Sequence, residues 1–241
     1  MGLFDAFKKN TNQPETAETP VAPSVDLTKK VNLAKEEVHK VCLTKRPLQN
    51  LKAKVALVLD YSGSMDGLYK RGVVQDVVER TLPLAMNFDD DGSMECWIFE
   101  NGFQRLPDVT MNNLSGYVQR ETKKYRMGGT CYAPVMLDIA NFYANEKVPV
   151  YVLFITDGDN SDKPAATKVI TDISKKPIFW QFVGVGSGPF SYLEQLDDMG
   201  GRYVDNADFF KVSNAANITY EQLLTEFPEW LENPMVKAML T

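Results

Sequence analysis

The sequence predicts an α/β fold: a doubly wound, mostly parallel sheet with one antiparallel edge strand, preceded by a disordered linker and a helix. Continuously apolar runs, such as residues 55–59 and 150–155, are typical of strands that are buried on both faces. Segments with apolar residues at helical spacing alternate with these runs, which favours a parallel sheet with helices on both faces. Asn101 and Gly102 separate two strand-like segments and predict a hairpin, hence one antiparallel strand.

The main domain is predicted to alternate strands and helices along its length. Proline is tolerated in the first turn of a helix, so Pro134 and Pro164 mark the starts of two helices. Thr219 and Gln222 have the spacing of a capping box and predict the start of the last helix. The expected strands are residues 55–59, 94–99, 103–109, 150–155, 178–183 and 202–204. The other expected helices are residues 73–82, 112–123, 190–199 and 219–231.

The first 50 residues are expected to precede this domain. Leu3, Phe4 and Phe7 would share one side of a short helix in residues 1–9, either as a docking peptide or weak membrane-surface anchor or as a simple tail. Prolines without periodicity in residues 10–25 predict a disordered linker. A helical pattern follows, which packs on the main domain or on a partner. The predicted parts are a flexible tail over residues 1–25, a helical extension over 26–50, the main domain over 51–233 and a C-terminal tail over 234–241.

The composition is that of a globular protein that can bury a full core. Of the 241 residues, 44% are hydrophobic and 24% are charged. The longest apolar run, residues 148–155, is much shorter than the ~18 residues that a membrane span needs. No secretory signal is expected at the start of the chain. The net charge of −6 argues against nucleic acid as a partner.

The cysteines and the histidine narrow the chemistry further. Cys42, Cys96 and Cys131 are widely spaced and odd in number, which argues against a disulfide framework or a zinc pattern. Free cysteines favour a reducing, cytoplasmic location. His39 is the single histidine, so we do not expect histidine-based catalysis.

Hard oxygen ligands follow the strands in three loops that should meet at one edge of the sheet. The five candidates are Asp60, Ser62, Ser64, Thr130 and Asp157. Two carboxylates brought together in a partly dry crevice repel each other unless a cation or a proton compensates them. Carboxylate and hydroxyl oxygens suit Mg²⁺ or Mn²⁺. The pattern therefore predicts a site for a divalent ion.

The spacing of these five residues resembles the metal-ion-dependent adhesion site of von Willebrand factor A (vWA) domains. That pattern is Asp-x-Ser-x-Ser, then a distant Thr, then a distant Asp in a Thr-Asp-Gly turn, and all five positions are present. The resemblance implies a vWA, Rossmann-like fold. It implies that the serines and the threonine coordinate Mg²⁺ directly, with Mn²⁺ or Ca²⁺ as alternatives, and that the aspartates act directly or through water. An acidic side chain of a protein partner then takes the open position.

Three further segments resemble the bacterial tellurium-resistance (TerF-like) branch of this family, namely residues 178–184, 204–210 and 226–231. The match spans roughly residues 52–231 and does not cover the first 25 residues. The resemblance implies a cytoplasmic scaffold in resistance to tellurite and other stresses or in phage defence. Other tellurium-resistance proteins are then candidate partners.

Three functions remain open at this point. We favour a metal-dependent protein-interaction module that is not an enzyme. A metal-assisted hydrolase is disfavoured because the domain has no histidine, no second carboxylate cluster and no convincing nucleophile–base pair. The third is a scaffold whose ion is purely structural and whose partner surface lies elsewhere, for example on the helix at residues 27–43.

Two features near the predicted site have simpler interpretations. Residues 184–188 are rich in glycine but lack the spacing of a dinucleotide-binding loop or a P-loop, so we interpret them as a strand-to-helix turn. Asp159 and Asp162 could help to shape the metal rim. Asp162 could equally cap the helix that begins near Pro164.

Overall fold

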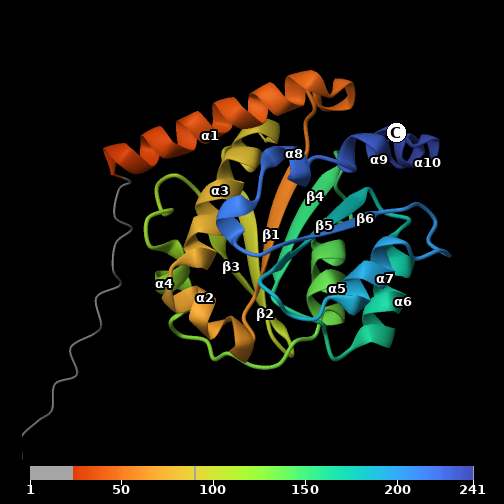
Figure 1. Cartoon of the computed structure of the whole chain (residues 1–241). Helices are drawn as coiled ribbons and strands as arrows, with labels where there is room; N and C mark the ends of the chain where they lie inside the picture. Colours follow the sequence, from red (N-terminus) through yellow and green to blue (C-terminus); the bar gives the residue numbers. More distant parts are fainter. Residues whose placement is uncertain (1–23, 90, 241) are drawn as a thin grey trace, which may run out of the picture.

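A six-stranded sheet runs through the centre of the computed structural model, which describes residues 24–89 and 91–240 (Figure 1). The strand order is β3-β2-β1-β4-β5-β6, and only the β2–β3 pair is antiparallel. The strands are β1 (Lys54–Asp60), β2 (Met94–Phe99), β3 (Phe103–Val109), β4 (Val150–Thr156), β5 (Ile178–Val185) and β6 (Ala207–Val212). The predicted fold class is therefore confirmed, including the antiparallel edge strand that follows Asn101 and Gly102.

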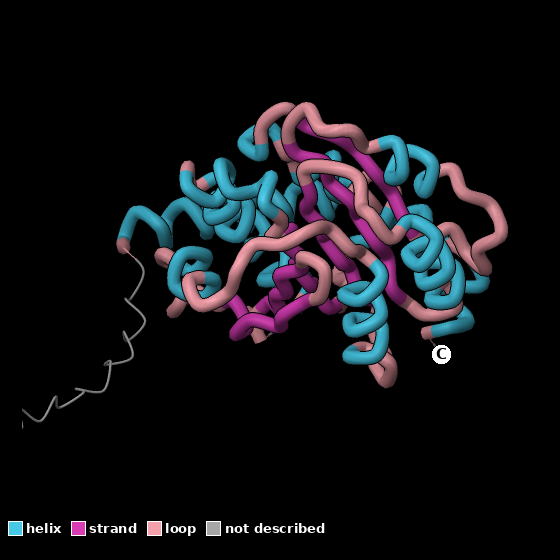
Figure 2. Tube along the Cα trace, turned by 90° about the horizontal axis from the view of Figure 1, so that it is seen from below, coloured by secondary structure: helices cyan, strands magenta, loops and turns pink. Residues whose placement is uncertain are grey.

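Helices cover both faces of the sheet, and Figure 2 shows the strands between the two helical layers. One layer holds α5, α6 and α7, and the other holds α1, α3, α4, α8, α9 and α10. The helices are α1 (Val25–Thr44), α2 (Asp66–Lys70), α3 (Val73–Phe88), α4 (Tyr117–Thr122), α5 (Ala133–Phe142), α6 (Lys163–Ile173), α7 (Ser191–Asp197), α8 (Tyr220–Leu223), α9 (Phe227–Glu232) and α10 (Pro234–Met239). Three short 3₁₀ turns lie at Arg46–Leu48, Gly63–Met65 and Ala215–Asn217.

The core follows from the alternation of side chains along the strands. Every residue of β4 is buried. Val152 and Phe154 pack toward α5 and α6, whereas Leu153 and Ile155 pack toward α3. A central strand with an apolar layer on each side is rigid, so its carboxyl end is a firm base for a site.

The helical extension packs on the main domain. α1 begins after Ser24, whose hydroxyl accepts the backbone N–H of Leu27 at 3.2 Å. Its buried residues are Val31, Val38, Val41 and Cys42. The ammonium group of Lys30 lies 2.7 Å from the carboxylate of Glu79 on α3. Of the two alternatives that the sequence left open, the structure shows that the buried face of α1 packs on the main domain.

The predicted strand at residues 202–204 is wrong, because the last strand is β6. The segment turns around Arg202 instead. The guanidinium of Arg202 donates to the carbonyl oxygens of Met199 and Asp197 at 3.1 and 2.9 Å and pairs with the carboxylate of Asp205 at 2.7 Å. These polar contacts determine the backbone conformation of residues 197–205, and they override the short strand-like pattern at residues 202–204.

The predicted last helix is divided into α8 and α9. The capping box of Thr219 and Gln222 is confirmed at the start of α8. Pro228 lacks an N–H group, and its ring would clash with the carbonyl group of Leu224 in a continuous helix. Beyond residue 233, where we predicted a tail, α10 forms with Val236 fully buried.

Two earlier expectations concern the membrane and the start of the chain. In the described part of the chain, no helix is long and apolar enough to cross a membrane. The predictions for residues 1–9 and for residues 10–23 of the linker lie outside the described residues. The last two residues of the predicted linker belong to the helix instead, because Ser24 is the N-cap of α1 and Val25 is its first residue.

Candidate metal centre

The two predicted carboxylates lie close together because their strands are parallel neighbours. Asp60 is the last residue of β1, and Asp157 directly follows β4. The two strands are paired as far as Leu59 and Ile155. Both chains therefore leave the sheet at the same edge, which is where parallel sheets hold their ligands.

Asp60 is fully buried and forms the base of the site. Its Oδ1 accepts the backbone N–H of Ser62 at 2.7 Å, and its Oδ2 accepts the hydroxyl of Thr156 at 2.6 Å. Burial raises the pKa of Asp60 to about 6, although these hydrogen bonds oppose the shift. A carboxylate at this depth is costly unless a positive charge accompanies it.

A chain of close oxygen atoms leads from this base toward the solvent. The hydroxyl groups of Ser62 and Ser64 are 3.0 Å apart, and the Ser64 hydroxyl donates to Oδ1 of Asp157 at 2.8 Å. Burial also raises the pKa of Asp157, and the Ser64 hydroxyl opposes that change. Three of the predicted ligands are thus joined by hydrogen bonds between their side chains.

Thr130 lies on the wall of the same cleft. The cleft has a volume of about 480 Å³, and Ser64, Thr130 and Asp157 all line it. The carbonyl oxygen of Thr130 accepts the backbone N–H and the hydroxyl of Ser161 at 2.8 and 2.9 Å, which fixes this loop. The structure therefore brings the five predicted residues to one place: three line the cleft, and two are buried below it.

Glycines allow the loop at residues 127–130 (the Thr130 loop) to approach the loop at residues 61–64. Gly128 donates its N–H to the carbonyl oxygen of Tyr61 at 3.3 Å and accepts the N–H of Gly63 at 3.0 Å. A Cβ on Gly128 would lie 2.5 Å from Oε2 of Glu100, so a larger residue would require the Glu100 side chain to move.

Sequence reasoning missed two residues that support the site. Thr156 holds the buried carboxylate of Asp60, as described above. Gly188 packs against the carbonyl oxygen of Asp157, where a Cβ would lie only 2.0 Å from that oxygen. The glycine-rich turn at residues 184–188 thus passes directly against the backbone of Asp157. The density of glycine directly after a strand was the available signal.

Asp159 and Asp162, the two other aspartates near the site, already accept hydrogen bonds from neighbouring groups of the chain. The Asp162 carboxylate accepts the backbone N–H groups of Tyr132 and Ala133, both at 2.9 Å, and so caps α5. Asp162 occupies the N-cap position of α6, but its side chain makes no capping hydrogen bond there, so the alternative in which it caps that helix is wrong. Asp159 accepts the Lys163 ammonium group at 2.6 Å and further bonds from α7.

The chemistry of the donor set fits a hard divalent cation. The side-chain donors are carboxylate and hydroxyl oxygens. Among the described residues, no Lys, Arg or His side chain forms an ion pair with Asp60 or Asp157. Within the same part of the chain, no group of three or more His, Cys, Asp or Glu side chains is placed to hold a metal. An ion at this site would therefore depend on the hydroxyl groups as well as on the two carboxylates.

Comparison with known proteins identifies the class of domain to which this architecture belongs. Residues 52–240 match the vWA-TerF-like family model, which describes a vWA domain found at the C terminus of TerF. The chain therefore belongs to the vWA-TerF-like family. It is also 40% identical over 221 residues to the uncharacterized protein YcbR of Bacillus subtilis (strain 168), and this match covers 87% of the chain and 90% of YcbR.

Several solved structures are similar at low sequence identity. A von Willebrand factor type A protein from Catenulispora acidiphila is 13% identical, with a TM-score of 0.49 over 78% of this chain and 43% of that protein. Proximal thread matrix protein 1 from the mussel byssus, with a zinc-occupied adhesion site, is 18% identical, with a TM-score of 0.48 over 78% and 46%. Manganese-loaded TRAP from Plasmodium vivax is 16% identical, with a TM-score of 0.49 over 78% and 74%. The chain spans less than half the length of the first two.

Proposed function

We propose that this chain is a divalent-metal-dependent protein-interaction module that acts as a scaffold or adaptor. The hydroxyl groups of Ser62, Ser64 and Thr130 would hold Mg²⁺, with Mn²⁺ or Ca²⁺ as alternatives. Asp60 and Asp157 would contribute directly or through water. The bound ion would supply a directional positive site for an acidic side chain of a protein partner.

One observation carries this proposal. Two carboxylates from neighbouring strands converge on a cluster of hydroxyl oxygens, and the described residues give them no side-chain cation. Ser64, the outermost hydroxyl group of this cluster, lines an open cleft that a partner can reach. The arrangement combines a need for positive charge with access from the solvent.

Binding is favoured over catalysis by the surroundings of the same cluster. The Ser64 hydroxyl donates to Asp157, and no histidine is available to activate it because His39, the single histidine, lies on α1. Membership of the vWA-TerF-like family supports a cytoplasmic role in resistance to tellurite and related stresses. Other tellurium-resistance proteins are the partners that we propose to test first.

The test combines metal binding with partner capture. Mg²⁺ is titrated calorimetrically into the full chain and into the Ser64→Ala and Asp157→Ala variants, with Asp172→Ala as the control. Asp172 is an exposed carboxylate on α6 that pairs with Lys168. We expect each site variant to bind Mg²⁺ at least ~10-fold more weakly, and the control to bind it like the parent.

Tagged parent and variant chains are then used to capture partners from source-cell extract in Mg²⁺ or in EDTA. Capture that requires Mg²⁺ and both site residues supports the proposal. Capture that persists in EDTA contradicts it. If Asp157→Ala abolishes Mg²⁺ binding while capture continues, the ion is structural and the partner surface lies elsewhere.

A further inference from the structure

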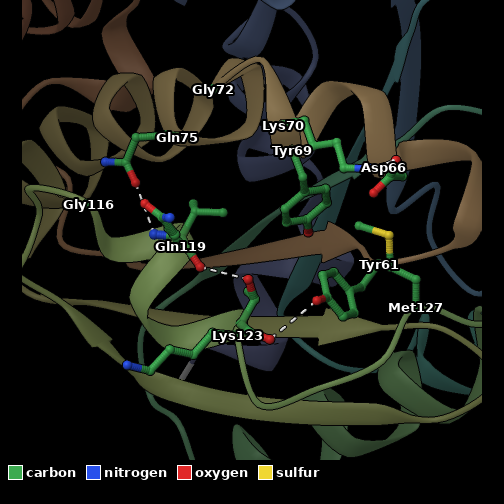
Figure 3. A pocket seen from close by; sticks show the side chains of 12 residues that line it. Tyr61, Asp66, Tyr69, Lys70, Gly72, Gln75, Gly116, Gln119, Lys123 and Met127 are labelled. Atoms are coloured by element: carbon green, nitrogen blue, oxygen red, sulfur yellow. Dashed lines mark hydrogen bonds and ion pairs between the residues drawn. The ribbon is translucent and has the colours of Figure 1, made fainter. Parts of the chain in front are cut away.

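A second cleft lies beside the metal centre, between α2 and α4 (Figure 3). Its volume is about 560 Å³. Its lining combines aromatic, amide and charged side chains and includes Tyr61, Tyr69, Gln75, Lys70, Lys123 and Met127.

Helix α2 and the Thr130 loop form the shared wall between the two clefts. On α2, Leu68 lines the metal cleft, whereas Tyr69 lines the second cleft. In the loop, Met127 lines the second cleft and Thr130 the metal cleft. The Tyr69 hydroxyl also donates to the carbonyl oxygen of Asp60 at 3.0 Å. A single extended segment that crosses this wall would therefore contact both clefts.

The floor of the second cleft is a fixed aromatic surface. The rings of Tyr61 and Tyr69 meet edge to face, with their centroids 5.1 Å apart. The Tyr61 hydroxyl donates to the carbonyl oxygen of Thr122 at 3.2 Å. Because both hydroxyl groups have backbone acceptors, the rings present apolar surface with a set orientation.

The rim of this cleft is basic, although the chain as a whole carries a net charge of −6. Lys70 pairs with Asp66 at 2.6 Å. Figure 3 shows Lys70 and Lys123 on different sides of the cleft. In the sequence, Arg71 stands between the lining residues Lys70 and Gly72, and Arg126 directly precedes Met127; both arginines are exposed. Within the described part of the chain, Arg71, Lys123 and Arg126 have no ion-pair partner. The rim thus holds positive charge that no carboxylate of the described chain neutralises.

We infer that the second cleft receives an acidic protein segment, so that one partner contacts both clefts with at least two carboxylates. This inference rests on the proposed function, in which the first carboxylate of the partner completes the metal centre. The second carboxylate would pair with Lys123 or Arg126, while an apolar side chain between them covers the tyrosine rings. The net charge of −6 favours a peptide with a few carboxylates over a nucleic-acid strand, which carries a negative charge at every nucleotide.

The probes are two fluorescein-labelled dodecapeptides of Ser, Gly and Leu, one containing a single Glu and the other containing four. Binding is followed by fluorescence anisotropy in Mg²⁺. We expect the four-Glu peptide to bind about 10-fold more tightly, and we expect added salt to reduce this advantage because exposed charges are screened. Lys123→Glu/Arg126→Glu should remove the advantage, so that the two peptides bind this variant with similar affinity. The control is Lys29→Glu/Lys175→Glu, which makes the same charge change at exposed residues on α1 and after α6.

The outcomes separate this inference from the proposed function. If EDTA leaves binding of both peptides unchanged, the proposed function is wrong. If binding requires Mg²⁺ but the Lys123→Glu/Arg126→Glu variant keeps the four-Glu advantage, the inference alone is wrong. Equal binding of the two peptides to the parent chain also contradicts the inference. Displacement of the four-Glu peptide by a twelve-nucleotide oligothymidylate at equal concentration would assign the rim to nucleic acid instead.

Discussion

Two regions of the domain hold a carboxyl group whose pKa is raised to about 6, and they differ in what lies around it. Asp60 is fully buried at the centre of the sheet, among hydroxyl groups. Asp197 is half-buried at the β6 edge, and the charge of Asp208 raises its pKa further. At the edge the chain supplies its own cation, because Arg202 donates to the backbone carbonyl oxygen of Asp197 and pairs with the carboxylate of Asp205.

The comparison separates a region where the chain places its own cation beside the acidic groups from a region where the described residues place none. In the edge region, the Arg202 side chain is only 2% exposed, and its guanidinium pairs with the carboxylate of Asp205. In the central region, the carboxylates of Asp60 and Asp157 have hydroxyl groups as their nearest side-chain partners. Positive charge is therefore internal at the edge, whereas at the centre no side chain of the described residues pairs a cation with Asp60 or Asp157.

Removing the internal cation should give the largest effect. Arg202→Met keeps most of the side-chain length but removes the bonds to Met199, Asp197 and Asp205. We expect the free energy of unfolding to fall by about 3 kcal/mol, because two hydrogen bonds from a buried charged donor to backbone carbonyl oxygens are lost, at about 1.5 kcal/mol each. Urea denaturation measures this change.

The destabilisation caused by Arg202→Met should be the same with and without Mg²⁺, because the positive charge that it removes belongs to the chain. Lys211→Met is the control. Lys211 forms an exposed ion pair with Glu194 at 2.8 Å, and its loss should cost less than about 1 kcal/mol. If Arg202→Met is no more destabilising than this control, the contrast between the two regions is wrong.

Supplying the external cation should give the next largest effect. At a Mg²⁺ concentration of about 100 times Kd, binding to the folded state alone raises the free energy of unfolding by about 2.7 kcal/mol. Asp157→Ala removes one predicted ligand and should abolish this gain. Urea denaturation in Mg²⁺ and in EDTA measures both. An equal response of the parent and Asp157→Ala would place the ion elsewhere.

The sequence was sufficient to predict the central region because its geometry follows from strand direction. Apolar runs that end in Asp60 and before Asp157 identify two buried strands, and parallel strands bring their carboxyl ends to one edge. The hairpin and the capping box of Thr219 and Gln222 were also local signals, and both are confirmed.

The remaining details depend on contacts between residues that are distant in the sequence. Asp162 caps α5 across 29 and 30 positions, which no local pattern indicates. The last strand begins at Ala207 because Arg202 reaches back to α7 and turns the chain first. The role of Gly188 appears only when the backbone of Asp157 is placed beside it. Sequence periodicity does not encode these approaches.

The contact between Gly188 and Asp157 gives a third way to test the central region. Gly188→Ala places a methyl group against a backbone carbonyl oxygen, which cannot rotate away as a flexible side chain can. We expect a loss of about 2 kcal/mol in the free energy of unfolding and about 10-fold weaker binding of Mg²⁺. Gly200→Ala is the control, because nothing lies within 4 Å of its Cβ position. Unchanged Mg²⁺ binding in Gly188→Ala would show that this turn does not position Asp157.

The smallest expected effect is the pH dependence of the edge region. Burial and the carboxylates of Asp208, Asp198 and Asp205 raise the pKa of Asp197 to about 6 from an ordinary value of 3.8. The folded state therefore holds a proton that the unfolded state releases between about pH 4 and 6, so this group lowers stability as the pH rises through that range. Above about pH 6, Asp197 is charged in both states, and the folded state bears the whole free-energy cost of that charge.

Asp197→Asn should remove that cost while its side-chain oxygen keeps the bond from the backbone N–H of Phe209, which is 3.0 Å long. We expect a gain of about 1 kcal/mol at pH 8, after allowance for solvent screening of a half-exposed group. The gain should be almost absent at about pH 2.8, where the Asp197 carboxyl is mostly protonated in both states. Asp198→Asn makes the same charge change on the exposed neighbour and should gain less at pH 8. Equal gains would mean that net charge, rather than the local surroundings of Asp197, sets the stability of the edge.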